Sequence, residues 1–240
     1  MTFDEIIDFR ASNRKFHPEV PVPAEVIEKA LKHATLAPNS SNMQLWEFHW
    51  TKSPEAKAKM VEACLSQMAA RSAQEMVVFV TRRDLWRKRR QWHLDWIDKD
   101  AERIGDPNAR SIKLRRKYYG SLMPVFYFND GFGLMGIFRR VTTFFVGLRR
   151  PIVRGEGHAG QRISVHKSCA LAAENFMLSC AAQGFHTCPM EGFDAKMVKK
   201  QLKLPRGAEI NMVIAVGKGT KEGFWGPRRR VADEEVIFRH

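Results

Sequence analysis

The amino-acid sequence predicts a protein of the α+β class, in which helices and strands are mixed without regular βαβ alternation. Its 240 residues, 44% of them apolar, suffice for one domain with a sizeable hydrophobic core. Helical periodicity and turn residues delimit helices at 2–10, 23–37, 54–72, 166–184 and 194–203. Alternating or continuous apolar patterns predict strands at 46–50, 76–81 and 210–219, and a further short strand that ends at Pro189.

The boundaries in the first half of the chain follow from proline and from apolar spacing. A helix opens at Pro23, with Glu25 in its first turn, and ends before Pro38. Its apolar residues share one face: Val26, Ile27, Ala30, Leu31 and Ala34. The polar stretch 38–46 is expected to be a loop, and alternating aromatic residues then predict a strand: Trp46, Phe48 and Trp50.

The second half is delimited in the same way. Residues 166–184 predict a strongly apolar helix that ends at Gly184, and the short strand to Pro189 follows. Beyond the strand at 210–219, the tail carries three consecutive arginines, Arg228–Arg230.

Positive charge is concentrated in one part of the chain. The formal net charge is +14, yet residues 82–162 alone hold 19 Lys and Arg against 8 Asp and Glu. We therefore expect a single domain over residues 1–240, in which residues 82–162 are a basic insert that forms a lid and the remainder of the chain is nearly neutral. Below, residues 82–162 are called the insert. Such an excess favours an anionic partner, whether a membrane surface, a nucleic acid or a phosphorylated ligand.

The beginning of the insert, residues 82–96, interleaves basic residues with three tryptophans. This composition can bind single-stranded nucleic acid through phosphate pairing and base stacking. It also suits a solvated basic helix with one apolar stripe formed by Leu85, Trp92 and Trp96. No RNA-recognition, KH or zinc-finger pattern supports a nucleic-acid partner, so the basic helix is favoured.

A second feature of the insert is an amphipathic helix over 131–150. Its apolar face consists of Leu134, Ile137, Phe138, Val141, Phe144, Phe145 and Leu148. Arginines and threonines occupy the other face, and no apolar run approaches the roughly 18 residues of a spanning helix. Two interpretations are open: the apolar face packs against a protein partner surface, which is the commoner case, or it rests on an anionic membrane.

The same region contains the spacing G-x-G-x-x-G at Gly131, Gly133 and Gly136, after a strand-like run at 125–128 and twenty residues before Glu156. This is the spacing of a dinucleotide-binding fold. Because Pro124 interrupts the strand and further βαβ units are missing, a glycine hinge is the favoured interpretation.

The cysteines are sparse and have apolar neighbours: Cys64, Cys169, Cys180 and Cys188. They lack the spacing of a zinc site, so no metal is expected, and they suit the reducing cytoplasm as buried small hydrophobic residues. The N-terminal residues mix acids and bases without an apolar core, unlike a signal peptide.

Arginines with a neighbouring hydroxyl occur near the start of the chain, at Arg10, Ser12 and Arg14. A guanidinium group pairs bidentately with phosphate, so these residues suit a bound phosphate. Helix capping or surface ion pairs would explain them equally well.

Four motifs in order resemble the FMN-dependent nitroreductase family. They are R-x-S-x-R-x-F at 10–16, A-P-N-S-S-N-M-Q-L-W at 37–46, P-M-E-G-F-D at 189–194, and the late triplet at 228–230. Together they lie on both sides of the insert. The resemblance implies an α+β fold with a mixed sheet flanked by helices, in an intertwined homodimer that holds FMN at the subunit interface.

The resemblance also implies cofactor-binding residues. It assigns the FMN phosphate to Arg10, Ser12, Arg228 and Arg230, and places Arg14 near the pyrimidine edge of the flavin. The partner subunit is expected to contribute Pro38, Asn39, Ser40 and Asn42 to the site. Beside the flavin ring the resemblance places Pro189, Met190, Glu191 and Gly192, with a backbone N–H group of Glu191 or Gly192 facing the flavin N5 atom. Gln67 is the nearest match to a further flavin-contacting residue of the family.

The activity implied is the NADH- or NADPH-dependent reduction of a small electron-poor acceptor, such as a nitroaromatic or a quinone, by ping-pong hydride transfer. No catalytic side chain is assigned, because hydride transfer between donor, flavin and acceptor needs little acid–base help. The chain departs from the family pattern at Leu45, where Pro is usual, and at Asn39, where Ser is usual. A membrane-associated quinone reductase is the alternative, and a basic nucleic-acid-binding module is a weaker one.

Overall fold

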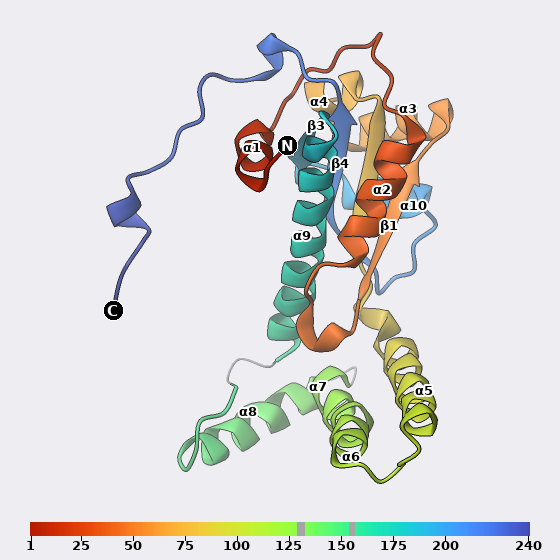
Figure 1. Ribbon diagram of the computed structural model, residues 1–240, viewed down its shortest axis with the longest axis vertical. Coiled ribbons are helices and arrows are strands. Elements are labelled where there is room, and N and C mark those ends of the chain that lie inside the picture. The colour runs from red at the N-terminus through yellow and green to blue at the C-terminus, as the bar shows by residue number, and fades with distance from the viewer. Residues whose placement is uncertain (129–132, 154–156) are drawn as a thin grey trace.

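The computed structural model describes residues 1–128, 133–153 and 157–240 (Figure 1). Its centre is a four-stranded sheet in the order β1-β2-β4-β3. The strands are β1 (Trp46–Thr51), β2 (Glu75–Thr81), β3 (His186–Met190) and β4 (Glu209–Gly217). All three pairings are antiparallel, so the expected mixed sheet is corrected to an antiparallel one. The predicted strands themselves are confirmed.

Two long helices cover one face of the sheet. They are α2 (Ala24–Thr35) and α9 (His158–Ala182), and their apolar sides enclose a core with Phe79, Ile214 and Val216 from the strands. The apolar face predicted for the first of them is confirmed, except that Leu31 is only partly buried. Helix α9 begins eight residues before the predicted start, at the end of the insert. The short helix α1 (Phe3–Phe9) lies beside its other end (Figure 1).

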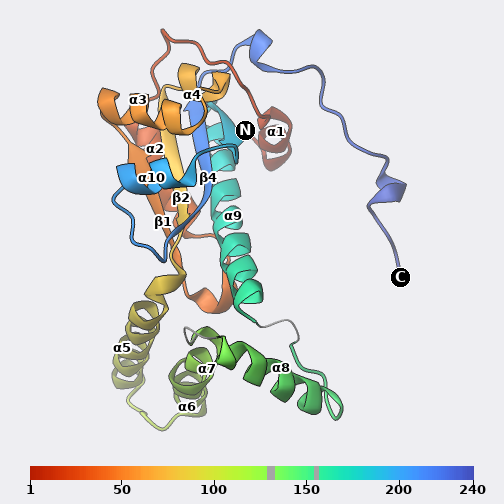
Figure 2. The same cartoon turned by 180° about the vertical axis from the view of Figure 1, so that it is seen from behind.

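Three shorter helices cover the opposite face: α3 (Pro54–Ala63), α4 (Met68–Ser72) and α10 (Ala195–Gln201) (Figure 2). The single helix predicted over 54–72 is therefore wrong. Leu65 and Ser66 adopt left-handed backbone conformations, with φ of 56° and 51°, and these end α3 and turn the chain into α4. The domain thus has three layers, with the sheet in the middle.

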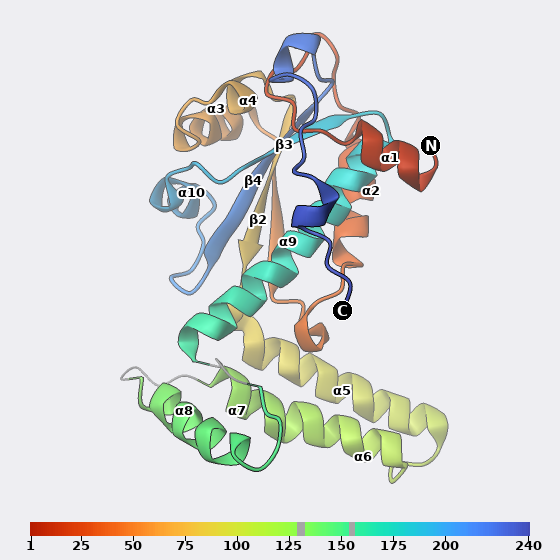
Figure 3. The same ribbon diagram turned by 90° about the vertical axis from the view of Figure 1, so that its left-hand side faces the viewer.

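The insert forms a helical layer at one end of the sheet (Figure 3). It comprises α5 (Trp86–Ile104), α6 (Arg110–Lys117), a π-helical turn at Tyr118–Leu122, α7 (Met123–Tyr127) and α8 (Leu134–Gly147). Residues 125–127 of the strand-like run before the glycines are therefore helical, and Pro124 is tolerated at the beginning of α7, in its first turn. Of the residues in the dinucleotide-like pattern, Gly131 and Glu156 lie outside the described residues.

The buried face of α5 differs from the prediction. Trp92 and Trp96 are about half exposed, at 48% and 50%, whereas the side chains turned inward are Trp86, His93, Ile97, Asp100 and Ala101. The inward residues Trp86, His93 and Ile97 have the same spacing as the predicted stripe but are displaced from it by one residue, which is about 100° around the helix. The basic helix is confirmed, and its predicted stripe is wrong.

The tail leaves the body after β4 and extends away from it (Figure 1). Residues 224–240 are exposed throughout and contain only a short 3₁₀ turn, Asp233–Glu235. Among the described residues, no helix has the length and apolar character needed to cross a membrane.

Candidate functional site

The first arginine motif lies along the edge strand β3. Ser12 forms a parallel bridge with Thr187, and the backbone N–H group of Asn13 donates to the Thr187 carbonyl at 3.1 Å. Arg14 lies close enough to Cys188 for its charge to lower the thiol pKa, although burial has the larger effect and raises that pKa overall. The motifs at 10–16 and 189–194 therefore meet at one edge of the sheet.

Asn13, between the motif residues, joins this edge to the tail and was missed by the sequence analysis. Its side chain is fully buried, and its Nδ2 donates to the Thr220 carbonyl at 2.8 Å. A Cβ atom at position 223 would stand 1.9 Å from the Asn13 Oδ1, so only glycine allows this approach. The glycines of G-K-G-T-K-E-G at 217–223 were the signal for such a tight turn.

The turn directs the start of the tail back over the arginine motif. The Arg14 guanidinium lies over the Trp225 ring, 4.0 Å from its centroid. Together these segments enclose a hollow of about 370 Å³, called the arginine hollow, lined by Arg10, Ala11, Ser12, Arg14, Phe224, Trp225, Gly226, Pro227, Arg228, Arg229 and Arg230. Trp225 is a lining residue that the motifs did not indicate.

Arg228 of the tail is bonded to the backbone at the end of α1. Its Nη2 donates to the carbonyls of Ile7, Asp8 and Arg10, at 3.1, 2.9 and 2.7 Å. These are carbonyls at the end of α1, where a cation is favoured. The guanidinium thus ties the tail to the first motif, while Arg230 remains exposed and donates only to the neighbouring Arg229 carbonyl among the described residues.

The P-M-E-G-F-D motif ends β3 beside the helix α4. Gln67 Nε2 donates to the Gly192 carbonyl at 2.5 Å and to the Cys64 carbonyl at 3.1 Å. Gln67, which the sequence analysis matched to a family contact, therefore touches this motif. Met190 is buried, but Glu191 and Gly192 are exposed. Their backbone N–H groups have no acceptor among the described residues, and so they are available to a ligand.

His186, the first residue of β3, lies between the two chain segments that bound the hollow. Its ring is 4.4 Å from that of Phe9 and 5.5 Å from that of Phe224. Its Nδ1 accepts a hydrogen bond from the Gly219 N–H group at 3.2 Å, so the ring carries its proton on Nε2. Burial, with a smaller effect from Lys218, lowers the pKa of His186 to about 4.

The loop motif at 37–46 has an unusual backbone. Ser41, Asn42 and Gln44 have φ of 54°, 48° and 49°, a left-handed region that costs non-glycine residues energy. Asn39 closes the loop, since its Oδ1 accepts from the Gln44 N–H group at 2.8 Å. The Ser40 N–H group donates to Ser168 Oγ of α9 at 3.2 Å. Residues 39–44 are called the left-handed loop.

Side chains of the insert hold the left-handed loop in this conformation. His93 Nε2 lies 2.8 Å from the Asn42 carbonyl, the Tyr119 hydroxyl donates to the Ser41 carbonyl at 3.0 Å, and Tyr118 contacts the Ser41 hydroxyl at 2.7 Å. Burial lowers the pKa of His93, although its bond to the carbonyl opposes this. Leu45, the departure from the family pattern, is buried in the cluster that joins the loop to the insert.

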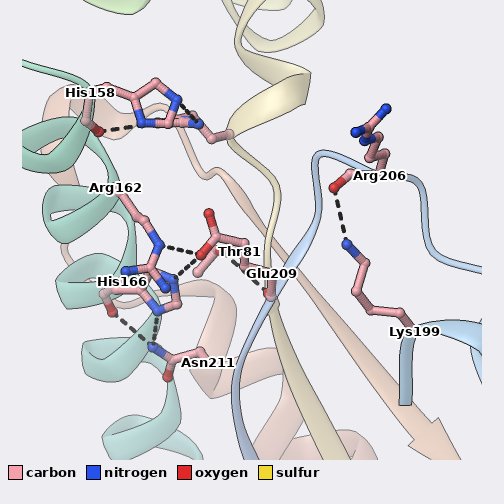
Figure 4. A network of polar contacts seen from close by, with 9 residues as sticks. Thr81, His158, Arg162, His166, Lys199, Arg206, Glu209 and Asn211 are labelled. Atoms are coloured by element: carbon pink, nitrogen blue, oxygen red, sulfur yellow. Dashed lines mark hydrogen bonds and ion pairs between the residues drawn. The ribbon is translucent and has the colours of Figure 1, made fainter. Parts of the chain in front are cut away.

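A polar network closes the base of the insert (Figure 4). Arg83, at the start of the insert, donates to the His158 carbonyl at 3.2 Å and contacts its ring nitrogen at 2.8 Å. About one and two turns further along α9, Arg162 and His166 bond to Glu209 of β4. Burial would raise the pKa of Glu209, but these two partners outweigh it and hold the pKa below its ordinary value. The two ends of the insert thus lie side by side against the sheet.

Within one chain, the left-handed loop and the arginine hollow lie apart. Arg10 is 3.9 Å from Glu174 on α9, whereas Ser40 bonds to Ser168. Six residues of helix separate these contacts by about 9 Å along the axis and about 120° around it. No hydrogen bond or ion pair among the described residues joins the two groups. The predicted site residues are thus brought together as two sets, with Arg10, Ser12, Arg14, Gly192 and Arg228 at one end and the loop residues at the other.

The cysteines are all buried, as predicted. Burial raises the pKa of Cys169 and of Cys180 to about 12, which makes these thiols unreactive at neutral pH. In the part of the chain that the structure describes, no group of three or more His, Cys, Asp and Glu side chains could hold a metal ion.

A family model described as the nitroreductase family matches residues 7–218. The chain belongs to the nitroreductase family. The matched residues include the first arginine motif, the left-handed loop and the P-M-E-G-F-D motif, while the triplet at 228–230 lies beyond them. The resemblance inferred from sequence motifs is confirmed.

Relatives of this nitroreductase-family chain match it along most of its length. Protein DrgA of Synechocystis is 27% identical over 221 residues, which is 92% of this chain and 85% of that protein. The oxygen-insensitive NAD(P)H nitroreductase of Salmonella typhimurium is 25% identical over 90% of this chain and 88% of that protein. A proposed nitroreductase of Exiguobacterium sibiricum, solved in complex with FMN, shares the fold with a TM-score of 0.71 at 19% identity, over 100% of this chain and 98% of that one.

Proposed function

We propose that the protein is an FMN-dependent oxidoreductase that takes electrons from NADH or NADPH. The observation that carries this proposal is the arginine hollow, which gathers guanidinium groups and the Ser12 hydroxyl beside the edge strand β3. The same strand leads into residues 191 and 192, whose backbone N–H groups have no acceptor among the described residues. Cations and hydroxyl donors are the groups that a phosphate ester requires. The donor set therefore fits FMN, whose phosphate is dianionic and whose ring accepts hydrogen bonds along its edge.

Each set of residues has a binding or orienting role. Arg10, Ser12 and Arg230 bind the phosphate, and Arg228 both contributes charge and holds the tail over the hollow. Arg14, kept in place by Trp225, offers a cation to the pyrimidine edge of the ring. Gln67 holds the Gly192 carbonyl and so fixes the backbone directly after the N–H groups of residues 191 and 192, which face the flavin in this proposal. FMN held by these residues would supply the hydride-accepting and electron-donating chemistry between the nicotinamide and the acceptor.

The protein acts as a homodimer in this proposal. No residue of the left-handed loop lines the arginine hollow of its own chain, and the two contact different sides of α9. A second copy would bring Pro38, Asn39, Ser40 and Asn42 to the hollow of the first, and two equivalent sites would result. The backbone strain of the loop supports this role, because strained conformations persist where function requires them.

The acceptor is a small electron-poor molecule, such as a nitroaromatic or a quinone. Donor and acceptor use the same side of the site in turn, so that NAD(P)H leaves before the acceptor binds. The insert shapes this side, because its aromatic residues contact the left-handed loop. A quinone is the acceptor favoured by the exposed apolar face of α8, since quinones dissolve in membranes.

The test begins with the absorbance spectrum of the purified protein, before and after addition of FMN and then of each nicotinamide under anaerobic conditions. We expect flavin bands that bleach on reduction. The Arg10→Ala/Arg228→Ala variant should bind FMN at least about tenfold more weakly, because it loses charge-assisted hydrogen bonds. The control is Lys196→Ala/Lys200→Ala, which removes two exposed cations of α10 and should retain FMN. A colourless protein that takes up no flavin would contradict the proposal.

A further inference from the structure

The apolar face of α8 is turned to the solvent. Six of its large side chains, and the Leu148 that follows it, are between 50% and 69% exposed; the six are Leu134, Ile137, Phe138, Val141, Phe144 and Phe145. Single exposed apolar residues are ordinary, but a continuous row of this size marks an interaction surface. No other described element of the same chain covers this face.

Buried polar contacts fix the orientation of α8. Arg139, only 6% exposed, donates through Nε to the Val125 carbonyl at 2.9 Å, and it also bonds to the Phe128 carbonyl. The Gln161 side chain of α9 donates to the Phe126 carbonyl. Arginine and glutamine thus satisfy carbonyls at the end of α7, on the side of α8 opposite to the phenylalanines. Rolling the helix to bury its apolar face would leave these carbonyls without donors.

Among the described residues on and beside α8, every charged side chain is positive. The described residues 133–153 include four arginines and no carboxylate. Arg140, Arg149 and Arg150 are exposed, and none forms an ion pair with a described carboxylate. An apolar row of phenylalanine, leucine and isoleucine bordered by arginines is the composition of helices that lie in the surface of an anionic membrane.

We propose that α8 is a membrane-docking surface, which buries its apolar row among the acyl chains of an anionic bilayer while Arg140, Arg149 and Arg150 contact lipid phosphates. Figure 1 shows α8 at the outer end of the molecule, away from the sheet, where a planar surface can reach it. The proposal stands independently of flavin binding. Only its consequence for substrate choice, an acceptor dissolved in the bilayer, rests on the proposed function.

Charge favours a bilayer over another copy of the chain. Two copies that paired symmetrically through α8 would bring arginines of both helices together, and the described residues 133–153 have no carboxylate to neutralise them. A nucleic acid would satisfy the arginines but leave the phenylalanines in water. An anionic bilayer supplies both the phosphates and the apolar interior that this surface requires.

The test is flotation of the full-length protein with phospholipid vesicles. We expect binding to vesicles of three parts phosphatidylcholine and one part phosphatidylglycerol, little binding to phosphatidylcholine alone, and release in high salt because counterions screen the arginines. The Phe138→Ser/Phe145→Ser variant should bind at least about tenfold more weakly, since two apolar anchors are lost. Arg149→Gln/Arg150→Gln should weaken binding to the anionic vesicles only.

Matched variants separate this effect from general changes in the protein. Leu65→Ser removes an equally exposed apolar side chain, at 66%, from the body, and Lys196→Gln/Lys200→Gln removes two charges from α10; both should bind like the wild type. Flavin content and circular dichroism show whether each variant is folded. Wild-type protein that floats with neither vesicle, or a Phe138→Ser/Phe145→Ser variant that binds undiminished, would overturn the proposal. A wild type that associates through α8 into larger oligomers without lipid, and loses this in the serine variant, would also overturn it.

Discussion

His186 shows how a side chain of ordinary type gains a particular role from its position. It is enclosed by Phe9 of α1 and Phe224 of the tail, and its unprotonated Nδ1 receives the Gly219 N–H group. Nearby, Asn13 holds the turn at 219–223 from inside. These two residues support the arginine hollow without lining it. Neither follows from a motif, because burial and partner choice depend on segments about 200 residues apart.

The lowered pKa of His186 predicts a loss of stability in mild acid. The unfolded chain binds a proton near pH 6.5, but the folded protein does so only near pH 4. Protons thus favour the unfolded state as the pH falls from 6.5 to 4, and the folded state loses about 1–2 kcal/mol, allowing for partial exposure of the ring. Urea denaturation at a series of pH values should show this slope. In His186→Gln, whose amide oxygen can accept the same hydrogen bond, the slope over this window should be smaller. The control is His240→Gln in the exposed tail. If His186→Gln and His240→Gln showed the same slope of unfolding free energy against pH, the lowered pKa would not belong to His186.

At the scale of elements, periodicity identified which residues share a face but not what that face meets. The apolar row of α8 was recognised from sequence, yet its exposure depends on Arg139 and on carbonyls of α7. Helix α5 was also predicted, although its inward face carries His93 and Asp100, which burial scales assign to the surface. Asp100 forms ion pairs with Arg103 and Arg115, at 2.7 and 2.6 Å. The apolar periodicity of the helix does not indicate which arginines pair with a buried carboxylate.

Removal of the buried guanidinium should loosen α8 from the rest of the insert. In Arg139→Met, the Val125 and Phe128 carbonyls lose their donor, and we expect the free energy of unfolding to fall by about 1–3 kcal/mol. Proteolysis under native conditions should also become faster within the insert. Arg140→Met is the control, since that side chain is exposed and should leave both measurements nearly unchanged. Equal behaviour of the two variants would show that Arg139 does not anchor the helix.

At the scale of the whole molecule, the sequence was sufficient for the α+β class, the strands, most helices and the family. The direction of strand pairing was not predictable, because period-two patterns are alike in mixed and antiparallel sheets. The motifs likewise did not indicate that the site residues form two separate sets, one at the arginine hollow and one at the left-handed loop. It follows from α9, whose Glu174 and Ser168 meet Arg10 and Ser40 on different sides of one helix.

This division makes the homodimer testable by complementation. One chain carries Arg10→Ala/Arg228→Ala, and the other carries Asn39→Ala/Asn42→Ala; each alone should retain little FMN. In a mixed dimer, one site collects both defects and the other collects none, so about one flavin per two chains should be recovered. Purification through two different affinity tags isolates the mixed dimer, and its flavin absorbance gives the count. Flavin content no higher than in the single variants would contradict a site shared between subunits.

The attachment of the left-handed loop to the insert limits how the protein can be engineered. His93, Tyr118 and Tyr119 belong to the insert, yet they hold the backbone of Ser41 and Asn42 in a conformation that those residues do not prefer by themselves. A designer who replaced the insert with that of a relative would therefore also remove the support of the loop. The transferable unit is the insert together with residues 39–45, and a change of acceptor specificity must be designed on both at once.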